Sequence, residues 1–226
     1  MARIELEFAD GFYVSQSGPF LEKRAVNVYP VIPNANAVTK RALFHTPGIS
    51  QFSDTASSGS RGVLVFSDGT PYRVIGNTLW SFDSSGNKTN HGAIAGSSDV
   101  SMASNGINIA IQDPTGNSYF FTPSTGVLEL NNGSVFLSFG QARTVTFKDG
   151  FYVYTTLKIF FSSSSKVVND GKDFNALDFA DAEIDPDLII KGFVDHNQLY
   201  ILGETTTQVY QTIATSGFPF QLVRGA

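Results

Sequence analysis

Short runs of β-branched and aromatic residues, separated by turn signals, recur along most of this chain. Runs such as RGVLVFS, INIAIQ, FYVYTT and QLYILG are typical of strands. Turn signals such as Asp68-Gly69, Asn105-Gly106 and Asp149-Gly150 separate them at the spacing of short strands. No segment keeps a 3.6-residue apolar period over the length of a normal helix. We therefore expect an all-β chain, in which only Phe174 to Glu183 could form a short helical turn.

The strand runs repeat as a larger unit. Four segments each hold a strand ending in a turn, an apolar strand and an aromatic strand: VFSDGTPYRVIGNTLWSF, ASNGINIAIQDPTGNSYFF, FKDGFYVYTTLKIFF and VDHNQLYILGETTTQVYQT. With Trp80, Tyr119, Ile159 and Val209 as equivalent positions, the steps are 39, 40 and 50 residues, close to the period of a four-stranded propeller blade. The sequence predicts a β-propeller-like array of four-stranded antiparallel blades, with a β-sandwich as the alternative.

Two regions are expected from this pattern. Residues 1–60 are predicted to form an N-terminal strand and an extended arm, because Val26 to Ser50 holds three prolines and no clear alternation. Residues 61–226 are predicted to form the propeller-like domain, of about four blade-like units. The chain closes on the apolar run FPFQLVRGA with no polar cap, so we expect the array to be incomplete and to continue past Ala226.

Strand alternation also predicts the buried face of each unit. The side chains expected there are apolar and lie on the central strands of the repeats. They are Val63, Val65, Val74, Ile75, Trp80, Ile109, Ile111, Phe120, Val145, Phe147, Val153, Phe160, Leu199, Ile201 and Val209.

Composition and charge exclude several classes of protein. A net charge of −5 argues against broad wrapping of nucleic acid, which needs a basic face to release counterions. The chain has no cysteine, so it can form neither a disulfide nor a thiolate metal site. No apolar run approaches the roughly 20 residues that span a bilayer, and the first residues do not resemble a signal peptide. We expect no membrane partner and assembly in a cytoplasm.

Catalytic and cofactor motifs are absent from the sequence. The three histidines, His45, His91 and His196, have no metal-ligand spacing. Asp195 and His196, with Glu204 nearby, could act as an acid/base pair, but a hairpin turn accounts for these residue types better. No phosphate-binding glycine loop or nucleophile elbow is present. We therefore assign no catalytic, cofactor-binding or metal-binding residue and expect no enzyme.

Exposed charge marks two segments as candidates for partner contact. One is the acidic stretch DFNALDFADAEIDPDL, which fails the EF-hand pattern at two positions and is expected to be a solvated or partner-facing loop. The other is the basic part of the N-terminal arm. The candidate residues are Lys23, Arg24, Lys40 and Arg41 in the arm, and Asp178, Asp181, Glu183, Asp185 and Asp187 in the acidic loop.

Several segments, in this order, resemble a phage family. AVNVYPVIP, ALFHTPGISQF, SRGVLVFSDGTPYRVIGNTLW, SDVSMASNGINIAI and FNALDFADAEIDPDLIIKGFVDHNQLYILGETTTQVYQT are followed by FPFQLVRGA. Together, from about Val26 to Ala226, they resemble the packaged-DNA stabilisation proteins, or tail accessory factors, of short-tailed bacteriophages. The order of these segments along the chain, rather than any one of them, is specific to the family. The chain is much shorter than is usual in that family.

The resemblance implies a structural protein of the virion tail. Such a protein forms a tail hub below the portal and its adaptor ring, closes the DNA channel after packaging, and carries the tail needle and tailspikes. The resemblance also implies a ring-shaped homo-oligomer that touches packaged DNA only in passing. Two other hypotheses are open: a propeller that binds or cleaves carbohydrate through exposed aromatic residues and carboxylate pairs, and a free-standing adaptor module with no phage role.

Overall fold

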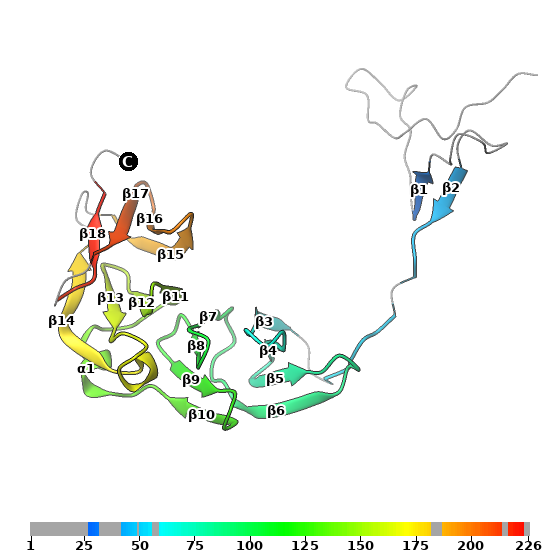
Figure 1. Ribbon diagram of the computed structural model, residues 1–226, viewed down its shortest axis with the longest axis horizontal. Coiled ribbons are helices and arrows are strands. Elements are labelled where there is room, and N and C mark those ends of the chain that lie inside the picture. The colour runs from blue at the N-terminus through cyan, green and yellow to red at the C-terminus, as the bar shows by residue number, and fades with distance from the viewer. Residues whose placement is uncertain are drawn as a thin grey trace, which may run out of the picture. The chain divides into compact units, whose positions relative to one another are not determined.

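The computed structural model describes residues 27–31, 42–48, 50–55, 59–181, 187–213 and 217–223. The chain divides into two compact units, Met1–Gln51 and Phe52–Ala226. Strands dominate the described residues of each unit (Figure 1). In the described part of the chain, no helix is both long enough and apolar enough to cross a membrane.

The described core of the first unit is an antiparallel pair of strands. Strand β1 (Val28–Val31) pairs with β2 (Ala42–His45) so that Tyr29 lies opposite Phe44. The two rings are 6.3 Å apart, and 44% of Tyr29 and 51% of Phe44 is exposed. Part of the expected arm is therefore a two-stranded ladder with an aromatic pair on its surface.

The described residues of the second unit form four sheets, each a four-stranded antiparallel meander, numbered here sheets 1 to 4 (Figure 1). Sheet 1 is β3 (Ser60–Val65), β4 (Pro71–Ile75), β5 (Thr78–Phe82) and β6 (Lys88–Ala93). Sheet 2 is β7 (Ser101–Ser104), β8 (Ile109–Gln112), β9 (Ser118–Thr122) and β10 (Val127–Leu130). Sheet 3 is β11 (Thr144–Lys148), β12 (Phe151–Thr155), β13 (Ile159–Ser163) and β14 (Phe174–Asp181). Sheet 4 is β15 (Ile189–Asp195), β16 (Gln198–Gly203), β17 (Thr207–Thr212) and β18 (Phe220–Leu222).

This topology confirms the predicted all-β, propeller-like array. The residues taken as equivalent from the sequence repeat, Trp80, Tyr119, Ile159 and Val209, lie on β5, β9, β13 and β17. Each of these is the third strand of its sheet. The period read from the sequence therefore corresponds to one complete sheet.

Tight turns join the first two strands of each sheet. Gly69 and Gly150 have φ values of 87° and 98°, in the left-handed region that favours glycine. His196 and Asn197 occupy the same region, with φ values of 43° and 62°. Asn tolerates this conformation better than most residues, and His does so to a lesser degree. The Asp195-His196 segment is therefore explained by the turn between β15 and β16.

The hydrophobic core lies between successive sheets. Three clusters fill junctions 1–2, 2–3 and 3–4, and the first strands of neighbouring sheets, β3, β7, β11 and β15, contact one another in order. At junction 1–2, Val74 and Leu79 of sheet 1 pack with Ile111 and Phe121 of sheet 2. Because side chains alternate along a strand, one face of each inner sheet meets the preceding sheet and the other meets the following one.

The short helical turn expected within Phe174 to Glu183 was wrong in position. Residues Phe174–Asp181 form strand β14, which pairs with β13. Among the described residues, the α-helix is the single turn α1 (Ser134–Ser138). A 3₁₀ turn, η2 (Asn169–Gly171), precedes β14. Pairing with β13 overrides the weak local preference of a short segment. Helix α1 places Phe136 in the core of junction 2–3, where its ring meets Tyr154 edge-on at 5.2 Å.

Most of the predicted core is buried, but its first two members are not. Val63 and Val65 of β3 are 61% and 63% exposed, so their prediction was wrong. Trp80, Phe147 and Val209 are half-buried. The fully or nearly buried members are Val74, Ile75, Ile109, Ile111, Phe120, Val145, Val153, Phe160, Leu199 and Ile201. Both faces of β3 are apolar, but only the face with Gly62 and Leu64 meets sheet 2.

Candidate interaction faces

The two end sheets each turn one face away from their neighbour. The front face belongs to sheet 1 and the back face to sheet 4. We define the front face as Val63, Val65, Arg73, Ile75, Trp80 and Phe82, which point away from sheet 2. We define the back face as Phe193, Tyr200, Leu202 and Val209, which point away from sheet 3.

The front face is a cross-strand row on β3, β4 and β5. Val63 pairs with Arg73, and Arg73 pairs with Trp80, so all three side chains lie on one side of the sheet. The Lys88 ammonium lies over the Trp80 ring, 5.4 Å from its centre. Arg73 is exposed, and the row is only partly covered.

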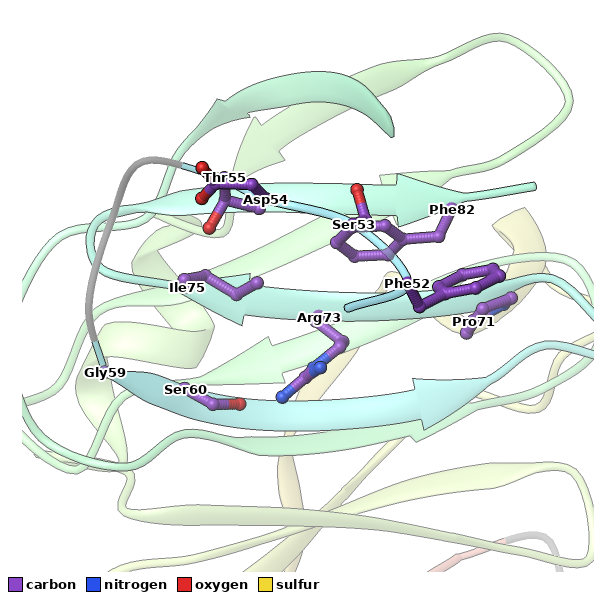
Figure 2. Close-up of a pocket in the computed structure, with 10 residues that line it drawn as sticks. All are labelled: Phe52, Ser53, Asp54, Thr55, Gly59, Ser60, Pro71, Arg73, Ile75 and Phe82. Carbon is purple, nitrogen blue, oxygen red and sulfur yellow. The ribbon is translucent and has the colours of Figure 1, made fainter. Parts of the chain in front are cut away.

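The segment 52–55 lies across part of the front face and leaves a hollow of roughly 520 Å³ beneath it (Figure 2). Figure 2 shows Phe52, Pro71 and Phe82 grouped at one end of the hollow. Lys88 donates to the carbonyl oxygen of Asp54, which ties the segment to β6. A Cβ atom at Gly86 would overlap the carbonyl oxygen of Phe52, so a glycine is required where the segment meets the hairpin. Phe52 itself stays 61% exposed.

The back face carries a stacked aromatic pair. Phe193 and Tyr200 lie opposite each other on β15 and β16, with ring centres 5.0 Å apart and planes inclined by 13°. Val209 pairs with Tyr200 from β17 and extends the same row. All three are half-buried, although no other sheet packs on them in the described residues. Lys191 and Leu202 form the next row, with the Lys191 side chain exposed.

A third feature is a hollow of roughly 490 Å³ lined by the first strands of sheets 2 to 4. Asp99, Arg143 and Lys191 supply its charged side chains, and Thr144 and Thr146 line its wall. The balance of charge is one acid against two bases. Such a wall offers contacts to a polar partner without a strongly basic patch.

Each internal junction also holds a polar link between sheets. The Arg61 guanidinium lies 2.5 Å from the Asp113 carboxylate at junction 1–2, and both side chains are nearly fully buried. Lys172 pairs with Glu129 at junction 2–3, where both side chains are partly exposed. At junction 3–4 the buried Lys148 ammonium donates to Asn197 Oδ1 at 3.0 Å. The sequence did not predict these links, because a charged residue within a strand is normally expected to face the solvent.

Arg61 reaches inward because β3 is irregular there. The register shifts between Ser60 and Gly62, and such a bulge re-aims the extra side chain. Its guanidinium donates to the carbonyl oxygens of Ser98, Gly76, Ile94 and Ala95 as well as to Asp113. All of its N–H groups are thereby engaged, by the β4–β5 turn, by the loop that joins sheets 1 and 2, and by Asp113 of sheet 2.

The basic candidates of the arm lie outside the described residues. These are Lys23, Arg24, Lys40 and Arg41. Glu183 and Asp185 of the acidic stretch also lie outside them. Their role as contact residues stays a prediction.

The three described acidic candidates do not form one loop. Asp178 and Asp181 lie on strand β14, and desolvation raises the pKa of the half-buried Asp178 carboxyl. Asp187 instead accepts hydrogen bonds from the backbone amides of Glu204, Thr205 and Thr206. These bonds lower the pKa of Asp187 to about 2. Asp187 therefore anchors the β16–β17 turn.

Among the described residues no cluster of His, Asp or Glu has the arrangement of a metal site. His196 Nδ1 lies 2.7 Å from Asp195 Oδ2, and both side chains are exposed at the β15–β16 turn. His91 lies at junction 1–2, where its Nε2 is 2.8 Å from Ser81 Oγ. Desolvation lowers the pKa of His91.

The family of the chain is decided by a match that spans nearly its whole length. Residues 4–226 match the family model described as bacteriophage P22 Gp10, β-propeller. The chain belongs to this Gp10 family. It is therefore a phage structural protein with a stabilisation role, associated with the virion. No curated protein sequence matches the chain significantly.

Solved structures agree with the Gp10 β-propeller fold. The crystal structure of the computationally designed Ika4 protein has a TM-score of 0.52 at 11% identity, covering 73% of this chain and 99% of its own. The structure of U3-55K has a TM-score of 0.52 at 13% identity, covering 72% of this chain and 51% of its own. The RRP9 WD40 repeats have a TM-score of 0.50 at 12% identity, covering 76% and 55%. The chain thus spans about half the length of the last two structures.

Proposed function

We propose that this Gp10-family chain is a component of the tail hub of a short-tailed phage. In this role it docks below the portal and its adaptor ring, closes the DNA channel after packaging, and carries the tail needle and tailspikes. The observation that carries the proposal is the family match over residues 4–226. The proposal includes assembly in the host cytoplasm into a ring-shaped homo-oligomer of the virion tail.

Charge supports a role beside DNA without tight binding to it. The net charge is −5, and the hollow along β7, β11 and β15 mixes Asp99 with Arg143 and Lys191. Strong phosphate capture needs a concentrated basic surface that releases counterions. A channel wall of mixed charge and hydroxyl groups lets DNA pass with transient contacts only.

The apolar and aromatic surfaces support a role in protein assembly. Tyr29 and Phe44 form an exposed pair on the N-terminal ladder, and the front and back faces present further apolar side chains. Exposed aromatic residues are typical of surfaces that bind other proteins. We propose that the N-terminal segment, with its ladder and its basic residues, contacts the portal–adaptor complex.

Co-sedimentation of the full chain with the portal–adaptor complex of its phage tests this function. We expect saturable binding to the complex and weak binding to naked DNA. Removal of residues 26–50 should weaken binding to the complex, and so should Tyr29→Ala with Phe44→Ala. Lys166→Glu, which changes an exposed charge elsewhere, is the matched control and should bind normally. Tight, steeply salt-dependent DNA binding without affinity for the complex would contradict the proposal.

A further inference from the structure

A hollow of roughly 610 Å³ lies at junction 2–3. Three segments line it: Pro114 of the β8–β9 turn, residues between 139 and 143 that join α1 to β11, and residues 156–159 at the β12–β13 turn. All three belong to the inner sheets 2 and 3 or to the link between them. We call it the junction 2–3 hollow, and it is a feature of an internal junction rather than of an end face.

Hydrogen bonds fix the walls of the junction 2–3 hollow. Gln141 Nε2 donates to the carbonyl oxygen of Pro114 at 2.9 Å, which ties the link between the sheets to the β8–β9 turn. In the β12–β13 turn, the Thr156 hydroxyl oxygen accepts hydrogen bonds from the backbone amides of Lys158 and Ile159. The walls are thus held in place by the fold itself, which lowers the cost of ordering them when a ligand binds.

Part of the wall is apolar. The Phe139 ring stacks on the buried Phe161 ring, with centres 4.2 Å apart and planes inclined by 15°. Phe139 and Ile159 stay half-buried, and Leu157 is 42% exposed. An apolar group that contacts these side chains removes them from water, which favours binding.

The charged side chains of the hollow are both cationic. Arg143 is half-buried, Lys158 is exposed, and no acidic residue lines the hollow. Among the described residues, neither the Arg143 guanidinium nor the Lys158 ammonium has an ion-pair partner. The cations that link one sheet to the next, Arg61, Lys148 and Lys172, are in contrast each paired with a carboxylate. The two cations of the hollow are therefore available to an anion from outside.

The surroundings of these cations select one kind of anion. A guanidinium binds a carboxylate through two parallel hydrogen bonds. A polyanion such as nucleic acid is disfavoured, because the chain has a net charge of −5 and only two cations line the hollow. We propose that the junction 2–3 hollow binds a carboxylate carried by an apolar group, with Arg143 paired to the carboxylate and Phe139 and Leu157 in contact with the apolar group. This inference is independent of the tail role proposed above.

Two probes present such a carboxylate from two different sources. Hexanoate represents a free aliphatic acid, and the peptide acetyl-Leu-Glu-Leu-amide represents a segment of a protein. Hexanamide and acetyl-Leu-Gln-Leu-amide are their uncharged counterparts. Titration of the full chain, followed by NMR of the backbone amides, should show saturable shifts at Gly140 and Leu157 with a dissociation constant in the millimolar range or below. The uncharged counterparts should bind about tenfold more weakly, and the carboxylate that binds more tightly identifies the source.

Substitutions in the hollow test the roles of its side chains. Arg143→Gln should raise the dissociation constant by about tenfold or more, and Arg143→Lys by less, because lysine keeps the charge but loses the two parallel hydrogen bonds. Leu157→Ser should weaken binding by about threefold, since less apolar surface is covered. Lys166→Gln removes one positive charge as Arg143→Gln does, but near the β11–β12 turn at the other end of sheet 3. It is the matched control and should bind like the wild type.

Spectra of the variants without a probe show whether each is folded, and the comparison of each carboxylate with its uncharged counterpart needs no variant at all. Three results would each overturn the proposal. One is the absence of saturable shifts at the hollow with both carboxylates, and another is equal binding of the charged and uncharged probes. The third is inorganic phosphate binding as tightly as both carboxylates, because the apolar wall would then contribute nothing.

Discussion

The internal junctions and the two end faces use similar strand residues, but they differ in what holds them. At junction 1–2, Val74 and Leu79 are fully buried, whereas Val63 on the front face is 61% exposed. Junction 1–2 also contains the buried Arg61–Asp113 pair, whereas Arg73 at the front face is exposed. The comparison shows that a sheet can carry apolar side chains on both faces whether or not another sheet covers them. Polar links between sheets accompany the packing where two sheets meet.

The buried pair of junction 1–2 should give the largest effect. Arg61→Met leaves the fully buried Asp113 carboxylate without its counter-charge, and we expect a loss of about 3–5 kcal/mol in the free energy of unfolding. The double variant Arg61→Met, Asp113→Asn should be more stable than Arg61→Met alone, because no charge is left buried. The double variant should still be less stable than the wild type, because the carbonyl oxygens that accept hydrogen bonds from Arg61 lose their donor. Urea denaturation of the three proteins measures these differences.

A matched control comes from junction 2–3. Lys172 pairs there with Glu129, but the two side chains are 22% and 45% exposed. Lys172→Met should cost less than about 1 kcal/mol, as is usual for exposed pairs. Equal losses for Arg61→Met and Lys172→Met would show that burial of the charge is not what distinguishes junction 1–2.

The apolar part of the comparison can be tested by shortening one valine on each side of sheet 1. Val74→Ala empties a fully buried position of junction 1–2 and should cost about 2–3 kcal/mol. Val63→Ala, on the front face, should change the free energy of unfolding of the isolated chain by less than about 0.5 kcal/mol. Denaturant midpoints at low protein concentration give both values. An effect of Val63→Ala that grows with protein concentration would indicate that the front face is covered by self-association.

The sequence predicted the array well because its signals are local. Turn residues such as Asp68-Gly69 and the alternation within each run depend only on neighbouring residues, and they placed Trp80 and its equivalents on the third strand of each sheet. Three features could not be read in this way. The exposure of Val63 depends on whether a sheet lies beyond β3, the burial of Arg61 depends on a bulge and on Asp113, 52 residues away, and β14 depends on pairing with β13.

The candidate contact residues show the same limit. Asp187 was grouped with its acidic neighbours by sequence, yet its carboxylate binds the backbone of the β16–β17 turn. A count of charges cannot separate a solvated carboxylate from one that receives several hydrogen bonds. The front and back faces were also not predicted as surfaces, because sequence alternation looks alike at an inner and an outer sheet.

The smallest effect expected concerns the response of junction 1–2 to pH. His91 lies 4.6 Å from the Phe121 ring and 5.7 Å from the Tyr72 ring, and desolvation lowers its pKa below the usual value of about 6.5. The folded state therefore favours neutral His91, and the unfolded state binds a proton more readily. It follows that the stability from this group is present above about pH 6.5 and is lost as the pH falls through the folded pKa.

His91→Gln removes this titration while keeping a polar side chain that can bond to Ser81. The free energy of unfolding of the wild type should fall more between pH 7.5 and 5.5 than that of His91→Gln, and the excess is the contribution of His91. Carboxylates titrate mainly below this range, so they contribute little to the difference. If the wild type and His91→Gln lose stability in parallel, protonation of His91 does not weaken the packing of sheets 1 and 2. The buried Arg61–Asp113 pair is then the main electrostatic feature that distinguishes junction 1–2 from the end faces.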